Sequence, residues 1–197
     1  MPLRTSLVLS LPDVELIVID ESFLDFSDLE SAMKLIPRAR NLVVVKSLGK
    51  SLGWHGVRLG YAAMNSQAAD ELRSQLPFWN VNGLAAYILK TLSEFKDEFR
   101  QSLALAAQDR AYMLNQLEQI PGLRVFPSKA NFLYVELPPT VSGRKLRDRL
   151  LEEYGLMVRE CSNKIGSSER YLRLAVQTKQ AVNPLVQALN RELALQP

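Results

Sequence analysis

The stretch KSLGKSLGWHGVRLGY, residues 46–61, gathers two lysines, an arginine and four glycines within sixteen positions. The run before it, NLVVVK at 41–46, is short, apolar and β-branched, which is typical of a buried strand that ends near Lys46. In α/β folds, loops at the carboxyl ends of strands bind ligands, and glycines let the backbone approach a ligand closely. We therefore expect an α/β fold in which residues 46–61 form a ligand site.

Three side chains of this stretch carry candidate chemistry. Lys50, between small residues, suits an amine that forms a Schiff base with a carbonyl better than Lys46 at the strand end. Arg58 offers a guanidinium and Ser47 a hydroxyl, and both groups bind phosphate. Together they suit a phosphorylated aldehyde, and a plain basic surface loop is the alternative. An ATP-binding P-loop is excluded, because Val44 stands where that motif needs its first glycine.

Composition sets outer bounds on the function. With 197 residues and 47% hydrophobic content, the chain can form one large or two small globular domains. Its 24 basic residues are spread along the chain, so we expect no nucleic-acid partner. A lone cysteine, Cys161, excludes an internal disulfide, and with a lone histidine it offers no metal cluster. No apolar stretch has membrane-spanning length, so we expect a cytoplasmic protein without membrane contact.

Strands and helices alternate along the chain without an internal repeat. We expect three parts: residues 1–81 as part of a large sheet domain, residues 82–119 as a helical linker interrupted near 93–96, and residues 120–197 as a small α+β domain. In the first part we expect strands at 14–20, 41–46 and 57–64, a helix at 28–36 stopped by Pro37, and a helix at 66–76 capped by Ser66. In the last part we expect strands at 123–126, 131–137, 156–161 and 171–176, a helix at 143–154, and a final helix with Asn183 as N-cap and Pro184 at its first position.

Two acids and an arginine add further candidates. Asp20 and Glu21 end the first expected strand, where an aspartate can face a pyridine nitrogen and keep it protonated. The alternative, which we prefer for Glu21 and not for Asp20, is that the acid caps the next turn. Arg173 interrupts the apolar strand at 171–176. It either points to solvent or clamps a substrate carboxylate with two hydrogen bonds.

Four segments carry a family resemblance and cover nearly the whole chain in family order: VIDESFLDF, SLGKSLGWHGVRLGY, GLRVFPSKANFLYVEL and GLMVRECSNKIGSSERYLRLAV. The chain resembles the carboxyl-terminal half of a fold-type-I aminotransferase of class I/II, within the histidinol-phosphate aminotransferase and threonine-phosphate decarboxylase group. The resemblance implies part of a large, mostly parallel sheet domain, a helical spine and a small α+β domain. It also implies pyridoxal 5'-phosphate as the cofactor.

The resemblance gives roles to single residues. A serine, a lysine three residues later and an arginine eight residues after the lysine are specific to this family, and Ser47, Lys50 and Arg58 satisfy that spacing. The resemblance implies that Lys50 is the Schiff-base lysine and the proton shuttle, and that Ser47 and Arg58 hold the cofactor phosphate. Asp20 matches the aspartate that pairs with the pyridine nitrogen, and Arg173 matches the arginine that binds the substrate carboxylate.

Other matches bear on substrate and completeness. Arg159 matches an arginine near the substrate in members that act on phosphorylated substrates. Phe23 stands where many relatives carry a tyrosine whose hydroxyl contacts the cofactor ring, so that hydrogen bond is absent or supplied elsewhere. The family's amino-terminal half has no counterpart in this sequence, and the family's active site lies at a dimer interface. We therefore expect a homodimer, or the missing half as a partner, and poor activity of this chain alone.

The expected function follows from the resemblance. It is amino transfer from an amino acid or amino phosphate, such as histidinol phosphate, to a 2-oxo acid, in amino-acid biosynthesis. One alternative is a decarboxylase similar to threonine-phosphate decarboxylase, which RECSN at 159–163 resembles while the loop around Lys50 is shared. The other alternative is a non-catalytic binding module that keeps the lysine loop.

Overall fold

The computed structural model describes residues 8, 10–11 and 13–195. The chain divides after residue 101 into two compact units, each with its own sheet and hydrophobic core. The division falls inside helix α5 (Lys96–Leu117), within the segment expected to be a helical linker. None of the helices in the described ranges is long and apolar enough to cross a bilayer.

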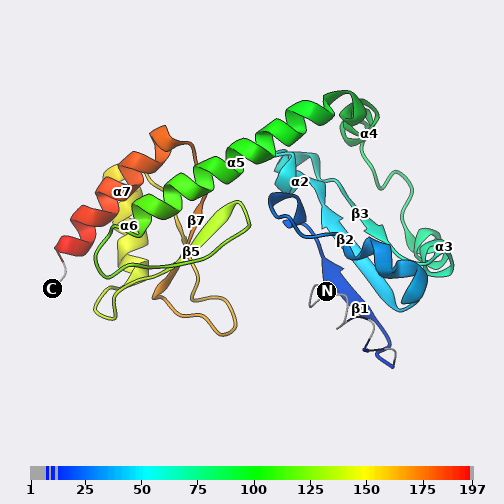
Figure 1. The fold of residues 1–197 in the computed structure, drawn as a ribbon, viewed down its shortest axis with the longest axis horizontal. Coiled ribbons are helices and arrows are strands. Elements are labelled where there is room, and N and C mark those ends of the chain that lie inside the picture. Colours follow the sequence, from blue (N-terminus) through cyan, green and yellow to red (C-terminus); the bar gives the residue numbers. More distant parts are fainter. Residues whose placement is uncertain (1–7, 9, 12, 196–197) are drawn as a thin grey trace. The chain divides into compact units, whose positions relative to one another are not determined.

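The first unit holds a three-stranded sheet in the order β1–β2–β3 (Figure 1). Its strands are β1 (Ile17–Asp20), β2 (Leu42–Ser47) and β3 (Gly60–Ala63). β1 pairs with β2 in parallel and β3 pairs with β2 antiparallel, so the sheet is mixed. All three expected strands are present; β1 and β3 are shorter than predicted, and β2 begins and ends one residue later than predicted.

The core of the first unit lies between β2 and a 3-10 helix, η2 (Ala32–Arg38). Leu42 and Val44 of β2 are fully buried there. The prediction that Pro37 stops a helix at 28–36 is wrong. A proline late in such an element removes only its own donor, and Ala39 N–H closes the turn beyond it by donating to the carbonyls of Leu35 and Ile36.

Helices follow β3 along the chain. α3 spans Ser66–Gln75 and α4 spans Gly83–Thr91, and a short 3-10 element, η1 (Leu24–Phe26), follows β1. The cap of α3 is Asn65, one residue before the expected Ser66, because the Asn65 side chain accepts a hydrogen bond from Ala68 N–H. The expected interruption near 93–96 is confirmed by η4 (Leu92–Phe95), which separates α4 from α5.

The second unit packs two helices against one face of an antiparallel sheet with the order β4–β5–β7–β6. Its strands are β4 (Arg124–Phe126), β5 (Phe132–Glu136), β6 (Arg159–Glu160) and β7 (Tyr171–Ala175). Its helices, beside the end of α5, are α6 (Gly143–Tyr154) and α7 (Lys179–Ala194). Alternate residues of β5 and β7 point into the core, which is what a sheet with one covered face requires.

The start of α7 differs from the prediction. The helix begins at Lys179, and Pro184 lies inside it instead of at its first position. Val182 N–H already donates to the Thr178 carbonyl, so a helical turn exists before the proline. Asn183 is not the N-cap. Its side chain instead accepts a hydrogen bond from the Tyr112 hydroxyl at 2.6 Å, which ties α7 to α5.

A buried carboxylate joins α7 to α6. Glu192 is 1% exposed and accepts hydrogen bonds from the Arg149 guanidinium and the Tyr154 hydroxyl. The hydrogen bond from Arg149 lowers the pKa of Glu192 below its ordinary value of 4.5, despite the opposing effect of burial. The ionised form of Glu192 therefore stabilises the folded second unit.

We predict that Glu192→Gln lowers the free energy of unfolding by roughly 1.5–3 kcal/mol at neutral pH, because bonds to a charged acceptor are replaced by bonds to a neutral one. The folded pKa is depressed, so this stabilisation is present above pH 4.5 and is lost as the pH falls through the lowered value. Denaturant unfolding at several pH values measures both effects. Glu153→Gln is the control, because Glu153 contacts the same arginine from an exposed position. Equal stability of the two variants would contradict the role of Glu192.

Candidate functional site

The lysine loop is a tight connection between β2 and β3. β2 ends at Ser47, the four-residue helix α2 (Leu48–Ser51) follows, and η3 (His55–Val57) leads into β3. Leu48 N–H donates to the Leu59 carbonyl, which closes the loop at its base. A Cβ at Gly60 would lie 2.7 Å from the Lys46 carbonyl oxygen, so only glycine lets β3 approach β2 this closely.

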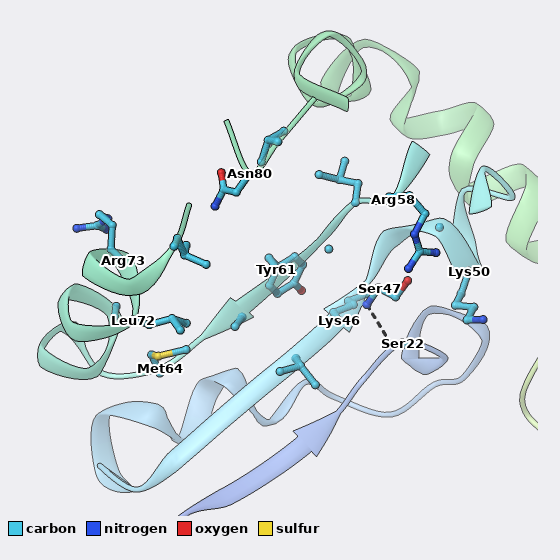
Figure 2. A pocket seen from close by; sticks show the side chains of 18 of the residues that line it. Ser22, Lys46, Ser47, Lys50, Arg58, Tyr61, Met64, Leu72, Arg73 and Asn80 are labelled. Atoms are coloured by element: carbon cyan, nitrogen blue, oxygen red, sulfur yellow. Dashed lines mark hydrogen bonds between the residues drawn. The ribbon is translucent and has the colours of Figure 1, made fainter. Parts of the chain in front are cut away.

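The loop forms part of the wall of a cavity of about 760 Å³ in the first unit. Figure 2 shows Ser47, Lys50 and Arg58 gathered at one end of this cavity, with Leu72 and Arg73 of α3 at the other end. Three predicted site residues from one stretch of sequence are thus brought together around one opening.

The two lysines of the loop have different surroundings. The Lys46 ammonium pairs with an Asp25 carboxylate oxygen at 2.5 Å, and the two side chains are only 11% and 19% exposed. No carboxylate among the described residues pairs with Lys50, whose ammonium lies 5.8 Å from the centre of the Phe23 ring. Attack on a carbonyl needs an amine that can give up its proton and reach the ligand. Lys50 meets that need better than Lys46.

Ser47 and Arg58 present polar groups to the same cavity. Ser47 is the residue before α2, yet its side chain makes no capping hydrogen bond, so its hydroxyl can serve a ligand. Arg58 is exposed, and one of its terminal nitrogens donates to the His55 carbonyl at 3.3 Å. Its backbone adopts the left-handed region, with φ of 57°, which is uncommon for residues other than glycine and clusters at functional sites.

The two acids after β1 act in different ways. The buried Glu21 carboxylate accepts hydrogen bonds from Ser31 Oγ and Ala32 N–H at the start of η2, so Glu21 has a structural role there and does not cap the turn directly after β1. Asp20 is exposed, and its Oδ1 accepts from both the backbone N–H and the hydroxyl of Ser22. Asp20 does not line the cavity, but Ser22 does. Asp20 therefore stabilises the turn, through one of its two carboxylate oxygens.

Ser22 is a residue that the sequence analysis missed. Its side chain is 7% exposed, and its hydroxyl accepts a hydrogen bond from Ser47 N–H at 3.0 Å (Figure 2). Ser22 could have been found from the sequence because a serine two residues after an aspartate favours local hydrogen bonds in a turn. His55, the lone histidine of the chain, is exposed and lines the cavity.

The two arginines that were expected to bind substrate belong to the second unit. Arg159 of β6 and Arg173 of β7 are directly opposite each other in the antiparallel pair, and both are exposed on the sheet face away from the core. The Arg173 guanidinium lies 5.2 Å from the centre of the Phe132 ring. Among the described residues neither arginine has an ion-pair partner. Two adjacent like charges without a carboxylate attract an anion.

The groups around the cavity fit pyridoxal 5'-phosphate. An amine without an acidic partner suits the aldehyde, and a hydroxyl and a guanidinium suit the phosphate. The cavity volume lies within the range usual for small-molecule sites. The residues present are therefore compatible with the cofactor that the sequence indicated.

Comparison with curated proteins gives relatives of two kinds. The chain is 37% identical over 186 residues to the CMP-5'-(3-aminopropyl)phosphonate synthase of Streptomyces rubellomurinus, covering 92% of this chain and 29% of that protein. It is 34% identical over 181 residues to the L-serine phosphate decarboxylase of Sulfurospirillum multivorans, covering 88% of this chain and 46% of that protein. The chain thus spans less than half the length of each of these relatives.

Several solved enzyme structures have the same fold as this chain. The histidinol-phosphate aminotransferase of Clostridium acetobutylicum has a TM-score of 0.88 at 27% identity, over 99% of this chain and 60% of that one. The L-threonine-O-3-phosphate decarboxylase of Porphyromonas gingivalis has a TM-score of 0.83 at 26% identity, over 97% and 58%. A more distant enzyme with the same fold, the histidinol-phosphate aminotransferase of Sinorhizobium meliloti, is in complex with pyridoxal-5'-phosphate; it has a TM-score of 0.83 at 21% identity, over 98% and 52%.

The model of one protein family matches residues 15–189, which includes β1, the lysine loop and both arginine-bearing strands. The matched range contains each residue that the sequence analysis selected for chemistry. The chain belongs to the class I and II aminotransferase family.

Proposed function

We propose that this chain is the cofactor- and substrate-binding part of a pyridoxal-phosphate-dependent aminotransferase that acts on an amino acid or an amino phosphate, such as histidinol phosphate, with a 2-oxo acid as the acceptor. The observation that carries the proposal is the meeting of Ser47, Lys50 and Arg58 in one cavity while Lys46 is held by Asp25. When bound, pyridoxal phosphate supplies an electron sink for negative charge at the substrate's α-carbon.

The four candidate residues of the first unit then have separate tasks. Lys50 would hold the cofactor at its aldehyde carbon and would also supply the amine that carries the proton of the substrate's α-carbon. Ser47 and Arg58 hold the phosphate and so fix the register of the whole cofactor. Asp20, which is hydrogen-bonded to the cavity-lining Ser22 but does not itself line the cavity, would offer the ring nitrogen the carboxylate oxygen that Ser22 does not use and so keep that nitrogen protonated.

Two arginines of the second unit are the candidates for substrate binding. We propose that Arg173 binds the substrate carboxylate and that Arg159 binds a second anionic group, such as a phosphate. Their direct opposition in β6 and β7, without carboxylate partners among the described residues, motivates this assignment. A guanidinium holds either anion with two parallel hydrogen bonds, which also fixes the orientation of the substrate.

Decarboxylation is the second candidate. The 34% identity to an L-serine phosphate decarboxylase favours it, as does the fold shared with an L-threonine-O-3-phosphate decarboxylase. Loss of the carboxylate uses the same lysine, aspartate and phosphate groups, and differs in which bond of the α-carbon breaks. Both candidates place an anionic group beside Arg159. They differ in whether an amino acceptor is needed.

The first test concerns the lysine. We expect borohydride reduction of the cofactor-loaded protein to fix the cofactor on Lys50, because Lys46 is engaged with Asp25. Lys50→Ala should abolish both the covalent label and turnover, whereas Lys46→Ala should keep a label on Lys50. Mass spectrometry of the peptides locates the modified residue. A label on Lys46 would disprove the assignment.

The second test separates the reactions. We expect conversion of histidinol phosphate that depends on a 2-oxo acid, and the competing outcome is release of carbon dioxide from L-serine phosphate or L-threonine phosphate. Arg159→Gln should lower kcat/KM for the phosphorylated substrate by roughly tenfold to a hundredfold, the loss of a charged hydrogen bond. Arg144→Gln, on the helix α6, is the control. Activity on unphosphorylated amino acids alone would overturn the role of Arg159.

We propose further that the rest of the family fold covers the sheet of the first unit. β1 lies at an edge of the sheet formed by the described residues, and two apolar side chains there, Leu16 just before β1 and Val18 within it, are 57% and 56% exposed. Parallel sheets are normally covered on both faces. The occupant is the amino-terminal half that the relatives carry, either in the same chain or in a partner, and the complete protein is a cytoplasmic homodimer.

The third test asks whether an amino-terminal half binds to the sheet of the first unit. We expect the 197-residue chain to be poorly active by itself and to bind a co-expressed amino-terminal half. Val18→Lys should reduce recovery of that half by at least roughly tenfold, because a charge placed in an apolar contact is costly to desolvate. Leu151→Lys, a similarly exposed position on α6, is the control. A single 197-residue chain that is monodisperse and fully active would contradict the proposal.

A further inference from the structure

The turn after β1 contains a hydrogen-bond relay that joins two strands. The hydroxyl of Ser22 donates to Asp20 Oδ1 at 2.5 Å and accepts from Ser47 N–H at 3.0 Å. The backbone N–H of Ser22 donates to the same Asp20 oxygen at 2.8 Å. One side chain, only 7% exposed, thus links the carboxylate at the end of β1 to the backbone at the end of β2.

The relay begins where the regular strand pairing stops. Asp20 is opposite Val45 in the parallel register, and Glu21 N–H donates to the Val45 carbonyl as the last backbone bond between the two strands. Beyond it, Ser47 is the residue that precedes α2, and its own side chain does not cap that helix. The Ser22 hydroxyl therefore provides the partner for the Ser47 amide and helps to fix where α2, which carries Lys50, begins.

The relay also orients Asp20. Two donors from Ser22 converge on Oδ1, so the plane of the carboxylate is restrained, and within the described residues Oδ2 has no hydrogen-bond partner. A serine that served only to form the turn would need its backbone N–H alone. The hydroxyl bond to Ser47, 25 residues away in sequence, goes beyond that need.

We propose that Ser22 is a positioning residue whose hydroxyl couples the orientation of Asp20 to the position of the Lys50-bearing helix. The proposal rests on the proposed function for the roles of Asp20 and Lys50. The coupling itself belongs to the protein without cofactor, so it can be tested separately. Ser22 lines the cavity, but it acts through its two neighbours and not on the substrate.

The experiment compares Ser22→Ala and Ser22→Thr in the full-length protein that carries this sequence. Alanine keeps the backbone bond to Asp20 and loses both hydroxyl bonds, whereas threonine keeps a hydroxyl. Ser27→Ala is the control, because the Ser27 hydroxyl donates to the Leu24 carbonyl within the same connection and does not reach β2. Amide hydrogen exchange at Ser47 and the chemical shift of the Asp20 carboxyl carbon are measured at one fixed pH without cofactor.

We expect Ser22→Ala to speed exchange of the Ser47 amide at least roughly tenfold and to change the chemical shift of the Asp20 carboxyl carbon. Ser22→Thr should restore both properties, and Ser27→Ala should change neither. With pyridoxal phosphate bound, the pH dependence of its visible absorption should shift in Ser22→Ala alone.

The possible results distinguish the coupling, the proposed function and the positioning role of Ser22. If the Ser47 amide and the Asp20 signal both keep their wild-type behaviour in Ser22→Ala, or if only one of them changes, the coupling is disproved. If both change without cofactor but the wild-type protein does not bind pyridoxal phosphate, the coupling stands and the proposed function fails. If both change while the absorption of the bound cofactor keeps its pH dependence, the relay is structural only and Ser22 has no positioning role in the reaction.

Discussion

The parallel pairing of β1 with β2 is the constraint on which the site depends. The register sets Asp20 opposite Val45, so the acidic turn after β1 and the lysine loop after β2 start at the same edge of the sheet. Two contacts then join the two connections: the Asp25 to Lys46 ion pair and the Ser22 hydroxyl bond to the Ser47 amide. Groups that lie some 25 residues apart in sequence become neighbours because a parallel sheet brings the carboxyl ends of its strands together.

The two lysines of the loop differ in whether they have an ion-pair partner. Lys46 and Lys50 are only four positions apart, yet one is neutralised by a carboxylate in a poorly exposed pair and the other is not. A pair that is largely removed from water costs much to break, because it leaves an unmatched charge behind. Asp25 therefore stabilises the connection after β1 and at the same time leaves Lys50 as the amine available to an aldehyde.

The sequence predicted most elements and missed those decided by tertiary contacts. Hydrophobic patterns located every strand, and the spacing of Ser47, Lys50 and Arg58 located three groups that line one cavity. Helix starts were less predictable: Pro184 suggested a first position, but hydrogen bonds to Thr178 had already formed the turn before it. Ser22 escaped notice because its function depends on a partner in another strand, which no local pattern reveals.

The candidate cofactor groups and the two candidate substrate arginines lie in different units of the chain. The cavity with the candidate cofactor groups belongs to the first unit, whereas Arg159 and Arg173 stand on the sheet of the second unit, which has its own core. Substitutions on the exposed face of that sheet leave the buried leucines of β5 and β7 in place, so the arginine positions can change without disturbing the lysine loop. Under the proposed function, such a division lets the substrate groups vary while the cofactor groups stay the same, and the similar chains do carry different names, L-serine phosphate decarboxylase and histidinol-phosphate aminotransferase.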